Sequence, residues 1–471
     1  MTEKIGHRIF TAGDLIWFAE ASGDWNPIHV DPVKARRTLA GEVVVHGMFS
    51  LLWALECHFS TKRNIPGTIS AYFQRPVLTG EALDVYREVS GEGVRLGISR
   101  KSEEVASVVL SGMGKHIEQC MGASRPAKGK PVVKTFEELR GSTGSVEITA
   151  LASDVSGEFA HVSQIMGAVR VAGIMAFSRI VGMECPGLHS LFTGLEITLD
   201  MAGREQMEWQ IARQSSPYAP LIISASGAGL KATLSAFVRP EPVAQMSISE
   251  VAKTVDPHAF AGQKALVIGG SRGLGELVAK LVAAGGGEVV ITYHKGAQDA
   301  QGVVKEIVAW GGKCRDVKVD VERPSLLTEA LQGWVPAQLY YFATPKITSQ
   351  KSGTFDEDLY ALFHRVYVTA FEAMVRMFAR HQRETLSVFY PSTVFVGQPP
   401  MDFAEYAAAK KAGEALCESL KHEIPYLHVV VHRLSKLKTD QTASLLPQSL
   451  KSPLPEIERI VREMQTLPKK V

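Results

Sequence analysis

An acid and an imidazole lie five residues apart in this 471-residue chain, as Asp24 and His29. Asn26-Pro27 stands between them, and proline fixes its own φ and disfavours the helical region for the residue before it. The two side chains can therefore converge from opposite sides of a bend. A carboxylate and a neutral imidazole so placed can hold a water molecule, one taking a proton while the other gives one. The spacing predicts addition or removal of water, whereas a capping Asp and a core His are the ordinary alternative for an isolated pair.

Regular elements on both sides of the bend must hold this pair in place. Apolar residues at helical spacing predict a helix over residues 12–22, which delivers Asp24 at its end. A second helix, from residue 49 to about residue 57, is apolar on all sides and should be buried. Alternating patterns predict strands over residues 68–73, 82–89, 94–100 and 105–113. We expect a buried helix wrapped by antiparallel strands.

The run Ala-Ser-Gly-Asp-Trp-Asn-Pro-Ile-His over residues 21–29 is followed by Ala35 and by Val45-His46-Gly47. This pattern resembles the signature of MaoC-like (R)-specific enoyl-thioester hydratases, which have the hotdog fold. The resemblance implies that Asp24 and His29 hold the catalytic water and that the backbone N–H of Gly47 polarises the thioester carbonyl. A donor of this kind at a helix start is typically worth about 3–4 kcal/mol. His46 is expected to be structural.

Residues 135–245 repeat the first segment in a degenerate form. The stretch 169–174 resembles the stretch 43–48, but Ala172 stands where the first copy has His46. The second copy also lacks an Asp-x-Asn-Pro-x-His sequence. A hotdog unit needs a partner to complete its sheet and to close an acyl pocket between two long helices. We therefore expect a catalytically silent pseudo-partner on the same chain, the alternative being an unrelated linker domain.

Strands and helices alternate after residue 263, which indicates a parallel, doubly wound sheet. A buried strand over residues 265–269 runs into a glycine-rich loop and then into a helix. Such a loop allows the backbone to approach a pyrophosphate at a helix N-terminus. The loop residues expected to bind a dinucleotide are Gly269, Ser271, Arg272, Gly273, Leu274 and Gly275.

The cofactor is predicted to be NADP(H) rather than NAD. The second strand ends in Tyr293-His294-Lys295-Gly296, without an acidic residue. A carboxylate there would pair with the 2′-hydroxyl of NAD, so its absence, with Arg272 in the loop and Lys295 nearby, favours a 2′-phosphate. Lys295 could equally be a solvated turn residue.

Tyr406 and Lys410 lie one turn apart on a predicted helix, downstream of a strand that ends in Ser392-Thr393. A nearby cation favours a phenolate, so Tyr406 is expected to act as an acid–base near neutral pH. Residues 263–446 resemble the short-chain dehydrogenase/reductases. The resemblance implies that the tyrosine exchanges a proton with the substrate oxygen, that the lysine binds ribose, and that a serine hydrogen-bonds the substrate. Ser392 is preferred on residue type, while Thr393 has the more usual spacing and stays open.

Other positions show how far this part follows the family pattern. Asp320-Val321 looks like the family's adenine-contacting pair. Tyr341-Phe342-Ala343-Thr344 replaces the usual Asn-Asn-Ala-Gly, Val366 or a neighbour replaces a relay asparagine, and Leu434-Ser435 replaces Pro-Gly. These departures affect the proton relay and the substrate loop more than cofactor binding.

The predicted fold class is an α+β double hotdog, an antiparallel sheet around long helices, followed by an α/β Rossmann domain with a doubly wound parallel sheet. The predicted boundaries are 1–120 for the catalytic hotdog, 121–134 for a linker, 135–245 for the second hotdog, 246–262 for another linker, and 263–471 for the reductase-like domain with its tail. In the tail, residues 452–466 are expected to form an amphipathic helix that packs against its own domain.

Composition excludes several classes of function. The chain has 51 basic and 49 acidic residues, a net charge of +2, which leaves no electrostatic footprint for nucleic acid. The five cysteines are scattered without a CxxC pair, so neither disulfides nor a metal site is expected. The start lacks a signal-peptide core and no run of about 18 apolar residues occurs, so we expect a cytoplasmic protein without membrane insertion.

The two chemistries together predict one pathway segment. A 3-oxoacyl thioester would be reduced with NADPH to a 3-hydroxyacyl thioester, and that alcohol dehydrated to a 2-enoyl thioester, or the reverse. The acyl carrier would be coenzyme A or an acyl carrier protein, and a homodimer through the reductase-like domain is expected. Two alternatives are a hydratase whose reductase-like part only binds nucleotide for structure or sensing, and a hotdog thioesterase that releases a free thiol.

Overall fold

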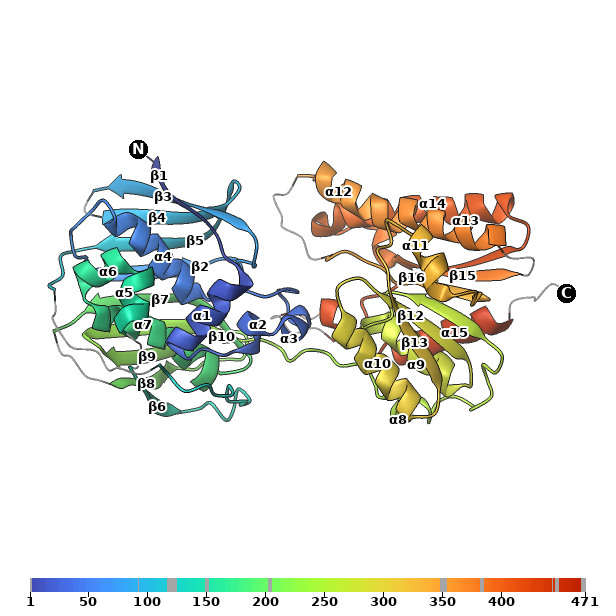
Figure 1. Cartoon of the computed structure of the whole chain (residues 1–471), viewed down its shortest axis with the longest axis horizontal. Coiled ribbons are helices and arrows are strands. Elements are labelled where there is room, and N and C mark those ends of the chain that lie inside the picture. Colours follow the sequence, from blue (N-terminus) through green and yellow to red (C-terminus); the bar gives the residue numbers. More distant parts are fainter. Residues whose placement is uncertain are drawn as a thin grey trace. The chain divides into compact units, whose positions relative to one another are not determined.

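The computed structural model describes residues 2–91, 93–116, 125–148, 152–201, 206–347, 354–381, 385–442, 444 and 449–466. Residues 121–124 of the expected first linker lie outside these ranges. The chain forms two compact units, which divide between Glu241 and Pro242 (Figure 1). Among the described residues, no single helix is long and apolar enough to cross a membrane, although the bent pair Ala160–Met166 and Ala168–Glu184 meets the length and composition criteria together.

The first unit is built on one antiparallel sheet of ten strands, in the order β1-β3-β4-β5-β2-β7-β10-β9-β8-β6. The order read from the second end, 6-8-9-10-7, reproduces the order 1-3-4-5-2 of the first half, so the sheet is a duplicated unit joined by β2 and β7 at its centre. The strands are β1 (Thr2–Ile9), β2 (Thr68–Phe73), β3 (Ala82–Ser90), β4 (Gly93–Arg100), β5 (Glu103–Ser111), β6 (Thr143–Glu147), β7 (Ser190–Leu199), β8 (Gln206–Arg213), β9 (Leu221–Gly227) and β10 (Leu230–Val238). This arrangement confirms the predicted double hotdog.

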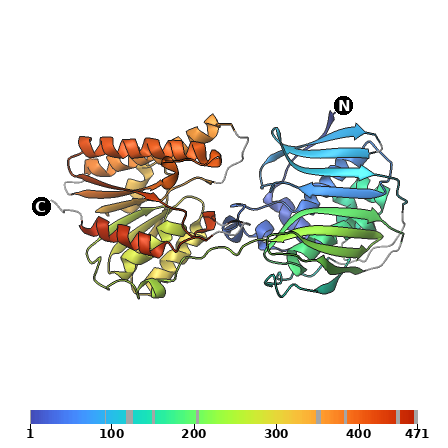
Figure 2. The ribbon, with the colours of Figure 1, turned by 180° about the vertical axis from the view of Figure 1, so that it is seen from behind.

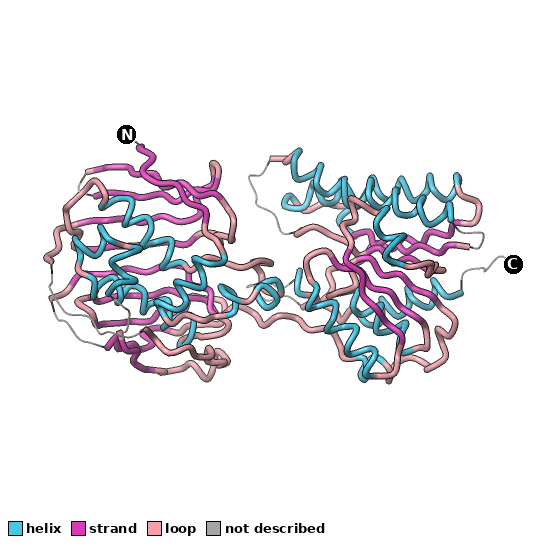
Figure 3. The backbone as a smooth tube through the Cα atoms, in the orientation of Figure 1, coloured by secondary structure: helices cyan, strands magenta, loops and turns pink. Residues whose placement is uncertain are grey.

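Helices of both halves lie along one face of this sheet, as the tube view shows (Figure 3). They are α1 (Ala12–Ser22), α4 (Gly47–Phe59), α5 (Ala152–Glu158), α6 (Ala160–Met166) and α7 (Ala168–Arg179), which continues as the π-helix η1 (Ile180–Glu184). Two short helices, α2 (Pro27–Val30) and α3 (Pro32–Arg36), follow α1 along the chain. The central helix α4 is buried over most of its length, as its all-round apolar sequence predicts. It begins at Gly47, two residues before the expected start.

The second unit has a parallel sheet of six strands in the order β13-β12-β11-β14-β15-β16, seen from behind in Figure 2. The strands are β11 (Lys264–Ile268), β12 (Glu288–Tyr293), β13 (Lys313–Lys318), β14 (Gln338–Tyr341), β15 (Leu386–Thr393) and β16 (Leu427–Leu434). The strand order reverses between β11 and β14, and ligands of doubly wound sheets bind in the crevice at such a point. The predicted Rossmann sheet is confirmed.

Two apolar clusters cover the two faces of this sheet. The helical elements are α8 (Ile248–Val251), α9 (Gly273–Ala284), α10 (Ala297–Ala309), α11 (Ser325–Leu331), α12 (Glu357–His364), η2 (Arg365–Ala370), α13 (Phe371–His381), η3 (Val394–Val396), η4 (Met401–Phe403), α14 (Ala404–Glu423), η5 (Asp440–Thr442) and α15 (Leu454–Thr466). The terminal helix α15 buries Ile457, Ile460, Val461 and Met464 in the cluster that also holds α9, so it packs against its own domain as expected.

Candidate active sites

Asp24 and His29 converge from the two sides of the Asn-Pro bend. Gly23 ends α1 in the left-handed conformation, with φ of 77°, and Asp24 follows it directly. Asn26 then caps a new short helix, because its side chain accepts a hydrogen bond from the N–H of Ile28 and Pro27 takes the first helical position. The bend is thus a helix start. His29 Nε2 lies 3.9 Å from Asp24 Oδ2, and the side chain of Asp24 is 2% exposed and that of His29 14%.

The protonation of His29 follows from its second nitrogen. His29 Nδ1 lies 2.7 Å from the carbonyl oxygen of Val44, which can only accept, so Nδ1 carries the proton and Nε2 is free to accept one. Burial lowers the pKa of His29, and Asp24 only partly offsets this effect. Burial likewise raises the pKa of Asp24 above its usual value. A neutral imidazole and a carboxyl group whose pKa is raised by burial therefore face each other.

The second half of the sheet supplies direct neighbours of Asp24. Ser178 of α7 donates a hydrogen bond of 2.7 Å to Asp24 Oδ2. Asn26 Nδ2 donates to the carbonyl oxygens of Gly182, at 2.8 Å, and Gly187, at 3.1 Å. Gly182 belongs to the π-helix η1, a form that is common at functional sites. The copy that lacks its own catalytic sequence thus positions the acid of the first copy.

A glycine is required at position 182 because Asp24 approaches it closely. A Cβ atom built there would lie 2.2 Å from Asp24 Oδ1. We expect Gly182→Ala to displace the carboxylate and to lower kcat for enoyl-thioester hydration by about 100-fold, since a misplacement of about 1 Å can cost that much. The matched control is Gly157→Ala on α5, where a Cβ would meet nothing within 4 Å. Equal activity of the two variants, measured at equal folded fraction, would contradict the prediction.

Gly47 and His46 lie at the start of α4, beside the pair. Gly47 is the first residue of this helix, and His46 before it makes no capping hydrogen bond with its side chain. The N–H groups of the first turn have no partner inside a helix, which leaves Gly47 suited to bind a carbonyl oxygen. The His46 ring stacks on that of His29, with centroids 3.9 Å apart, and its Nε2 donates to the backbone oxygen of Asp24 at 3.1 Å. His46 therefore orients both members of the pair.

Three potential metal-ligand atoms lie within 4.8 Å of one another, one each from Asp24, His29 and His46. This grouping follows from the stacking of the two imidazoles over Asp24. One nitrogen of each histidine is already bonded to a backbone carbonyl, at Val44 for His29 and at Asp24 for His46.

The glycine loop of the second unit has the geometry that a pyrophosphate site needs. Gly269 has φ of 80°, which favours glycine, and a Cβ there would lie 3.0 Å from the backbone of residues 342–343. A Cβ on Gly275 would lie 2.4 Å from the Gly269 oxygen. Helix α9 begins at Gly273, after Ser271 and Arg272, and Leu274 packs against the apolar cluster beneath. These backbone features fit a dinucleotide phosphate at a helix N-terminus.

The residues expected around the adenosine end of the cofactor differ from one another in burial and in their present contacts. Arg272 Nη1 forms an ion pair of 3.0 Å with Asp440 Oδ2. Lys295 is exposed on the loop after β12. Asp320 and Val321 are partly buried after β13, where Asp320 Oδ1 accepts a hydrogen bond from the N–H of Glu322. A 2′-phosphate would compete with Asp440 for Arg272.

Tyr406, at the start of α14, is hydrogen-bonded by Thr393 rather than by Ser392. The side chain of Thr393 hydrogen-bonds the phenol, whereas the Ser392 hydroxyl donates to Glu414 Oε1 at 2.5 Å. Glu414 is fixed in turn by Arg433. The preference for Ser392 is corrected on this geometry, because neighbouring residues of a strand point to opposite faces and only Thr393 faces Tyr406.

Lys410 does not tune Tyr406 as the sequence suggested. Its Nζ donates to the carbonyl oxygen of Pro391 at 2.6 Å and lies over the Tyr367 ring at 3.9 Å, but 6.0 Å from the centre of the Tyr406 ring. Burial lowers the pKa of Lys410 to about 7 and raises that of Tyr406 to about 12, the Thr393 hydrogen bond offsetting the latter only in part. Burial of Tyr406 thus opposes the phenolate that the sequence predicts near neutral pH.

Tyr367 lies next to Val366, in the segment where the sequence predicts a replacement for the relay asparagine. Tyr367 belongs to the π-helix η2, and its hydroxyl lies 2.5 Å from Thr344 Oγ1. Val366 or a neighbour is expected as the replacement, and Val366 itself contributes a backbone oxygen that accepts from the Tyr341 hydroxyl at 2.8 Å. The hydrogen-bonded hydroxyls of Tyr367 and Thr344 therefore lie close to Lys410, whose Nζ is over the Tyr367 ring.

Three neighbours of the two sites, Ser178, Gly182 and Tyr367, are not among the residues that the sequence predicts. The repeat could have pointed to Ser178 and Gly182. Residues 169–174 echo the start of the first copy's central helix, which predicts a second long helix opposite Asp24. No motif marks Tyr367.

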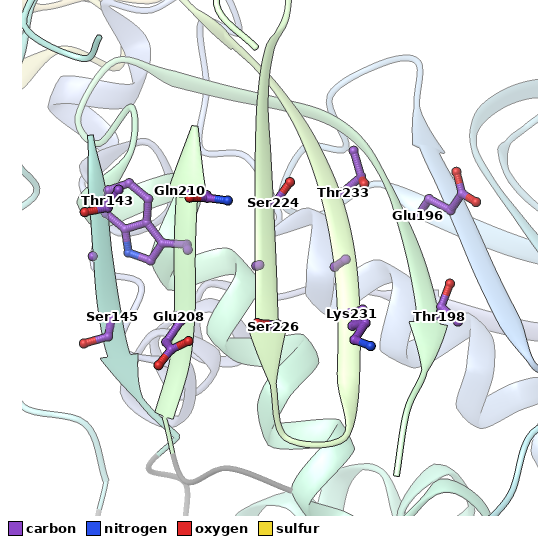
Figure 4. Close-up of a pocket in the computed structure, with 14 residues that line it drawn as sticks. Thr143, Ser145, Glu196, Thr198, Glu208, Gln210, Ser224, Ser226, Lys231 and Thr233 are labelled. Atoms are coloured by element: carbon purple, nitrogen blue, oxygen red, sulfur yellow. The ribbon is translucent and has the colours of Figure 1, made fainter. Parts of the chain in front are cut away.

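A polar hollow on the outer face of the sheet lies apart from both sites (Figure 4). Side chains of β6 to β10 line it, among them Glu196, Glu208 and Lys231, and the helices of the first unit lie behind the strands. Neither Asp24 nor His29 contributes to it.

Comparisons with known proteins agree with both halves of this description. A family model described as a MaoC like domain matches residues 5–112, and one described as short chain dehydrogenase matches residues 263–448. An uncharacterized oxidoreductase of Methylorubrum extorquens is 28% identical over 173 residues, 35% of this chain and 67% of that protein. The mitochondrial 3-hydroxyacyl-[acyl-carrier-protein] dehydratase of Arabidopsis thaliana is 35% identical over 83 residues, 16% of this chain, and the match spans only 46% of that protein.

Among solved structures, a short chain dehydrogenase from Burkholderia cenocepacia in complex with NADP is similar at a TM-score of 0.40 and 24% identity, covering 44% of this chain and 94% of that chain. A putative short chain dehydrogenase from Escherichia coli complexed with NADPH has the same TM-score at 18% identity, covering 44% and 93%. From the family matches and the two sheets, the chain carries a MaoC-like domain in residues 5–112 and a short-chain dehydrogenase domain in residues 263–448.

Proposed function

We propose that the chain is a bifunctional acyl-thioester enzyme. The MaoC-like domain would be an (R)-specific 2-enoyl-thioester hydratase, or 3-hydroxyacyl dehydratase in reverse, and the short-chain dehydrogenase domain an NADP(H)-dependent 3-oxoacyl-thioester reductase. The single observation that carries the proposal is the buried pair of Asp24 and His29, whose facing atoms lie 3.9 Å apart, with His46 and the start of α4 beside them.

Hydration begins with a water molecule held between Asp24 and His29. Since Nδ1 of His29 carries the proton, Nε2 takes a proton from the water as its oxygen bonds to the β-carbon of the enoyl group. The π electrons move toward the thioester oxygen, where the N–H of Gly47 stabilises the enolate charge. Protonated Asp24 then gives a proton to the α-carbon, and proton transfer from His29 to Asp24 restores the pair. Dehydration follows the same steps backwards.

In the second domain, Tyr406 would give its phenolic proton to the oxygen of a 3-oxoacyl group, and Thr393 would hydrogen-bond the phenol and the substrate. Bound NADPH would supply the hydride. The glycine loop of residues 269–275 would hold the pyrophosphate, with Arg272 and Lys295 near the 2′-phosphate and Asp320-Val321 near the adenine. Lys410 fixes the strand end through Pro391 and stands near the ribose in this proposal.

The shared 3-hydroxyacyl intermediate explains why the two domains occur on one chain. The proposal includes the boundaries given above for the two hotdog copies, the linkers and the reductase-like domain. It also includes a homodimer through the short-chain dehydrogenase domain, a coenzyme A or acyl-carrier-protein thioester as substrate, and a cytoplasmic location. The described cysteines Cys57, Cys185, Cys314 and Cys417 are unpaired thiols, which agrees with a reducing compartment.

One incubation tests the proposal as a whole. The protein is mixed with 2-enoyl and 3-oxoacyl thioesters of graded length on both carriers, with and without NADPH, and the products are identified by mass spectrometry. Formation of 3-hydroxyacyl thioesters from both substrates supports it. A free thiol as the main product would replace the hydratase with a thioesterase.

A second candidate keeps the hydratase but makes the short-chain dehydrogenase domain a nucleotide-binding module without turnover. The observation that favours it is that the two cations expected to bind the cofactor, Lys410 and Arg272, both contact other groups of the chain. Lys410 is bonded to Pro391 behind the tyrosine, and Arg272 is paired with Asp440. NADPH binding without oxidation by any 3-oxoacyl thioester would support this candidate.

The pKa of Tyr406 predicts the pH dependence of the reductase reaction. Alcohol oxidation needs the phenolate, whose fraction rises about tenfold per pH unit below a pKa of about 12. The rate of 3-hydroxyacyl oxidation should therefore rise steadily from about pH 6 to about pH 9, whereas reduction, which needs the protonated phenol, should stay flat. A plateau of oxidation near neutral pH would mean that Lys410 lowers the pKa of the phenol after all.

A further inference from the structure

Arg239 is a buried cation at the end of β10, in the half of the sheet that has no catalytic pair. The residue is 5% exposed. Its backbone N–H donates to the His189 oxygen at 2.7 Å, and its Nη2 donates to the Leu188 oxygen at 2.6 Å. The first bond holds the backbone of Arg239 against the loop that follows the π-helix η1, and the second holds its guanidinium there.

The rest of this guanidinium has no hydrogen-bond partner among the described residues. Nε and Nη1 are both buried and unbonded. Burial lowers the pKa of Arg239 to about 10, and no carboxylate offsets this effect. Glu241, the acid next to it in sequence, is largely exposed and lies 3.8 Å from Nε2 of His189 instead. A buried, unpaired charge is costly, so such a group is normally matched by an anion.

The guanidinium lies beside the hydratase pair. The Leu188 oxygen that accepts from Arg239 also accepts from Asn26 Nδ2 at 3.3 Å. Asn26 stands between Asp24 and His29 in the bend. The positive charge of Arg239 also acts on His29. Burial lowers the pKa of His29, and the charge of Arg239 lowers it further.

We propose that Arg239 binds a carboxylate carried by the acyl group, and that the hydratase substrate is therefore a carboxylated 2-enoyl thioester. This inference rests on the proposed hydratase function. An arginine matches carboxylate geometry and keeps its charge when buried. The other source of an anion is the phosphate of the pantetheine arm. It fits less well, because the arm separates it from the thioester by its whole length, whereas Arg239 lies next to the bend that carries the reacting pair.

The test compares paired substrates of equal chain length, one ending in a methyl group and the other in a carboxylate. Both series are prepared as thioesters of coenzyme A and of N-acetylcysteamine, which has no phosphate. The ratio of kcat/KM for the carboxylated to the neutral substrate is measured in the wild type, Arg239→Met, Arg239→Lys and Arg140→Met. Arg140 is an exposed control, its side chain 75% accessible. Since each ratio is taken within one protein, loss of folded fraction cancels.

We expect the wild type to prefer the carboxylated partner, and Arg239→Met to lower that ratio by about 10- to 100-fold, the usual worth of a hydrogen bond to a charged group. Arg239→Lys should retain part of the preference and Arg140→Met all of it. An unchanged ratio in Arg239→Met would overturn the inference, as would a loss confined to coenzyme A thioesters, which would assign Arg239 to the phosphate. Failure of the wild type to hydrate any enoyl thioester would overturn the proposed function and this inference with it, whereas equal hydration of both partners overturns the inference alone.

Discussion

Replacement of Asp24 by asparagine should lower kcat for hydration of a 2-enoyl thioester by about 100- to 10,000-fold, the usual contribution of a positioned acid–base. An asparagine has nearly the same shape, and its single amide oxygen can accept one of the two hydrogen bonds that Asp24 receives, from Ser178 at Oδ2 or from the N–H of Asn26 at Oδ1. What the variant loses is the proton that Asp24 gives to the α-carbon. The measurement is the loss of enoyl absorbance under saturating substrate.

The control for this prediction is Asp31→Asn in the same segment. Asp31 caps α3 by accepting hydrogen bonds from the N–H groups of Val33 and Lys34, and an asparagine can accept them as well. This variant should hydrate like the wild type, and His29→Gln should fall into the range of Asp24→Asn. Intact hydration in Asp24→Asn would remove the central assignment of the first domain.

Replacement of Tyr406 by phenylalanine should lower the reduction of a 3-oxoacyl thioester by about 100- to 10,000-fold and leave hydration unchanged. The phenol is buried and bonded to Thr393, so its removal deletes the only proton donor on α14 that this proposal uses, without adding volume. NADPH oxidation and enoyl hydration are followed in parallel on the same preparation. The difference between the two activities in one protein separates a chemical effect from misfolding.

Tyr426→Phe is the matched control for this variant. The Tyr426 hydroxyl donates to the Ala379 oxygen at 3.2 Å, away from α14's catalytic turn, and its loss should not affect reduction. Reduction by Tyr406→Phe at the wild-type rate would refute the role given to Tyr406. A wild type that binds NADPH but reduces no 3-oxoacyl thioester would establish the second candidate function. In that case the domain binds nucleotide without turnover, and Lys410 and Arg272 keep their contacts with Pro391 and Asp440.

Several features were readable from the sequence because they depend on residues close together along the chain. The bend at Asn26-Pro27, the glycine loop after β11 and the one-turn spacing of Tyr406 and Lys410 are local patterns, and each forms as the spacing predicts. The repeat of the first copy predicted a doubled sheet, and the strand order bears this out.

Only the tertiary structure decided which side chains complete each site. Ser178 meets Asp24 from 154 positions away, and Asn26 is held by carbonyl oxygens of η1 and the loop after it, contacts that no local spacing encodes. Thr393 rather than Ser392 meets Tyr406 because of the face on which each lies, and the pKa of Tyr406 rises because the fold buries it. The sequence by itself predicted the two chemistries and the residues proposed to carry them. Packing between distant segments decided which side chains contact these residues and how burial shifts their pKa values. It also buried the cation of Arg239, because burial and long-range contacts exist only in the folded chain.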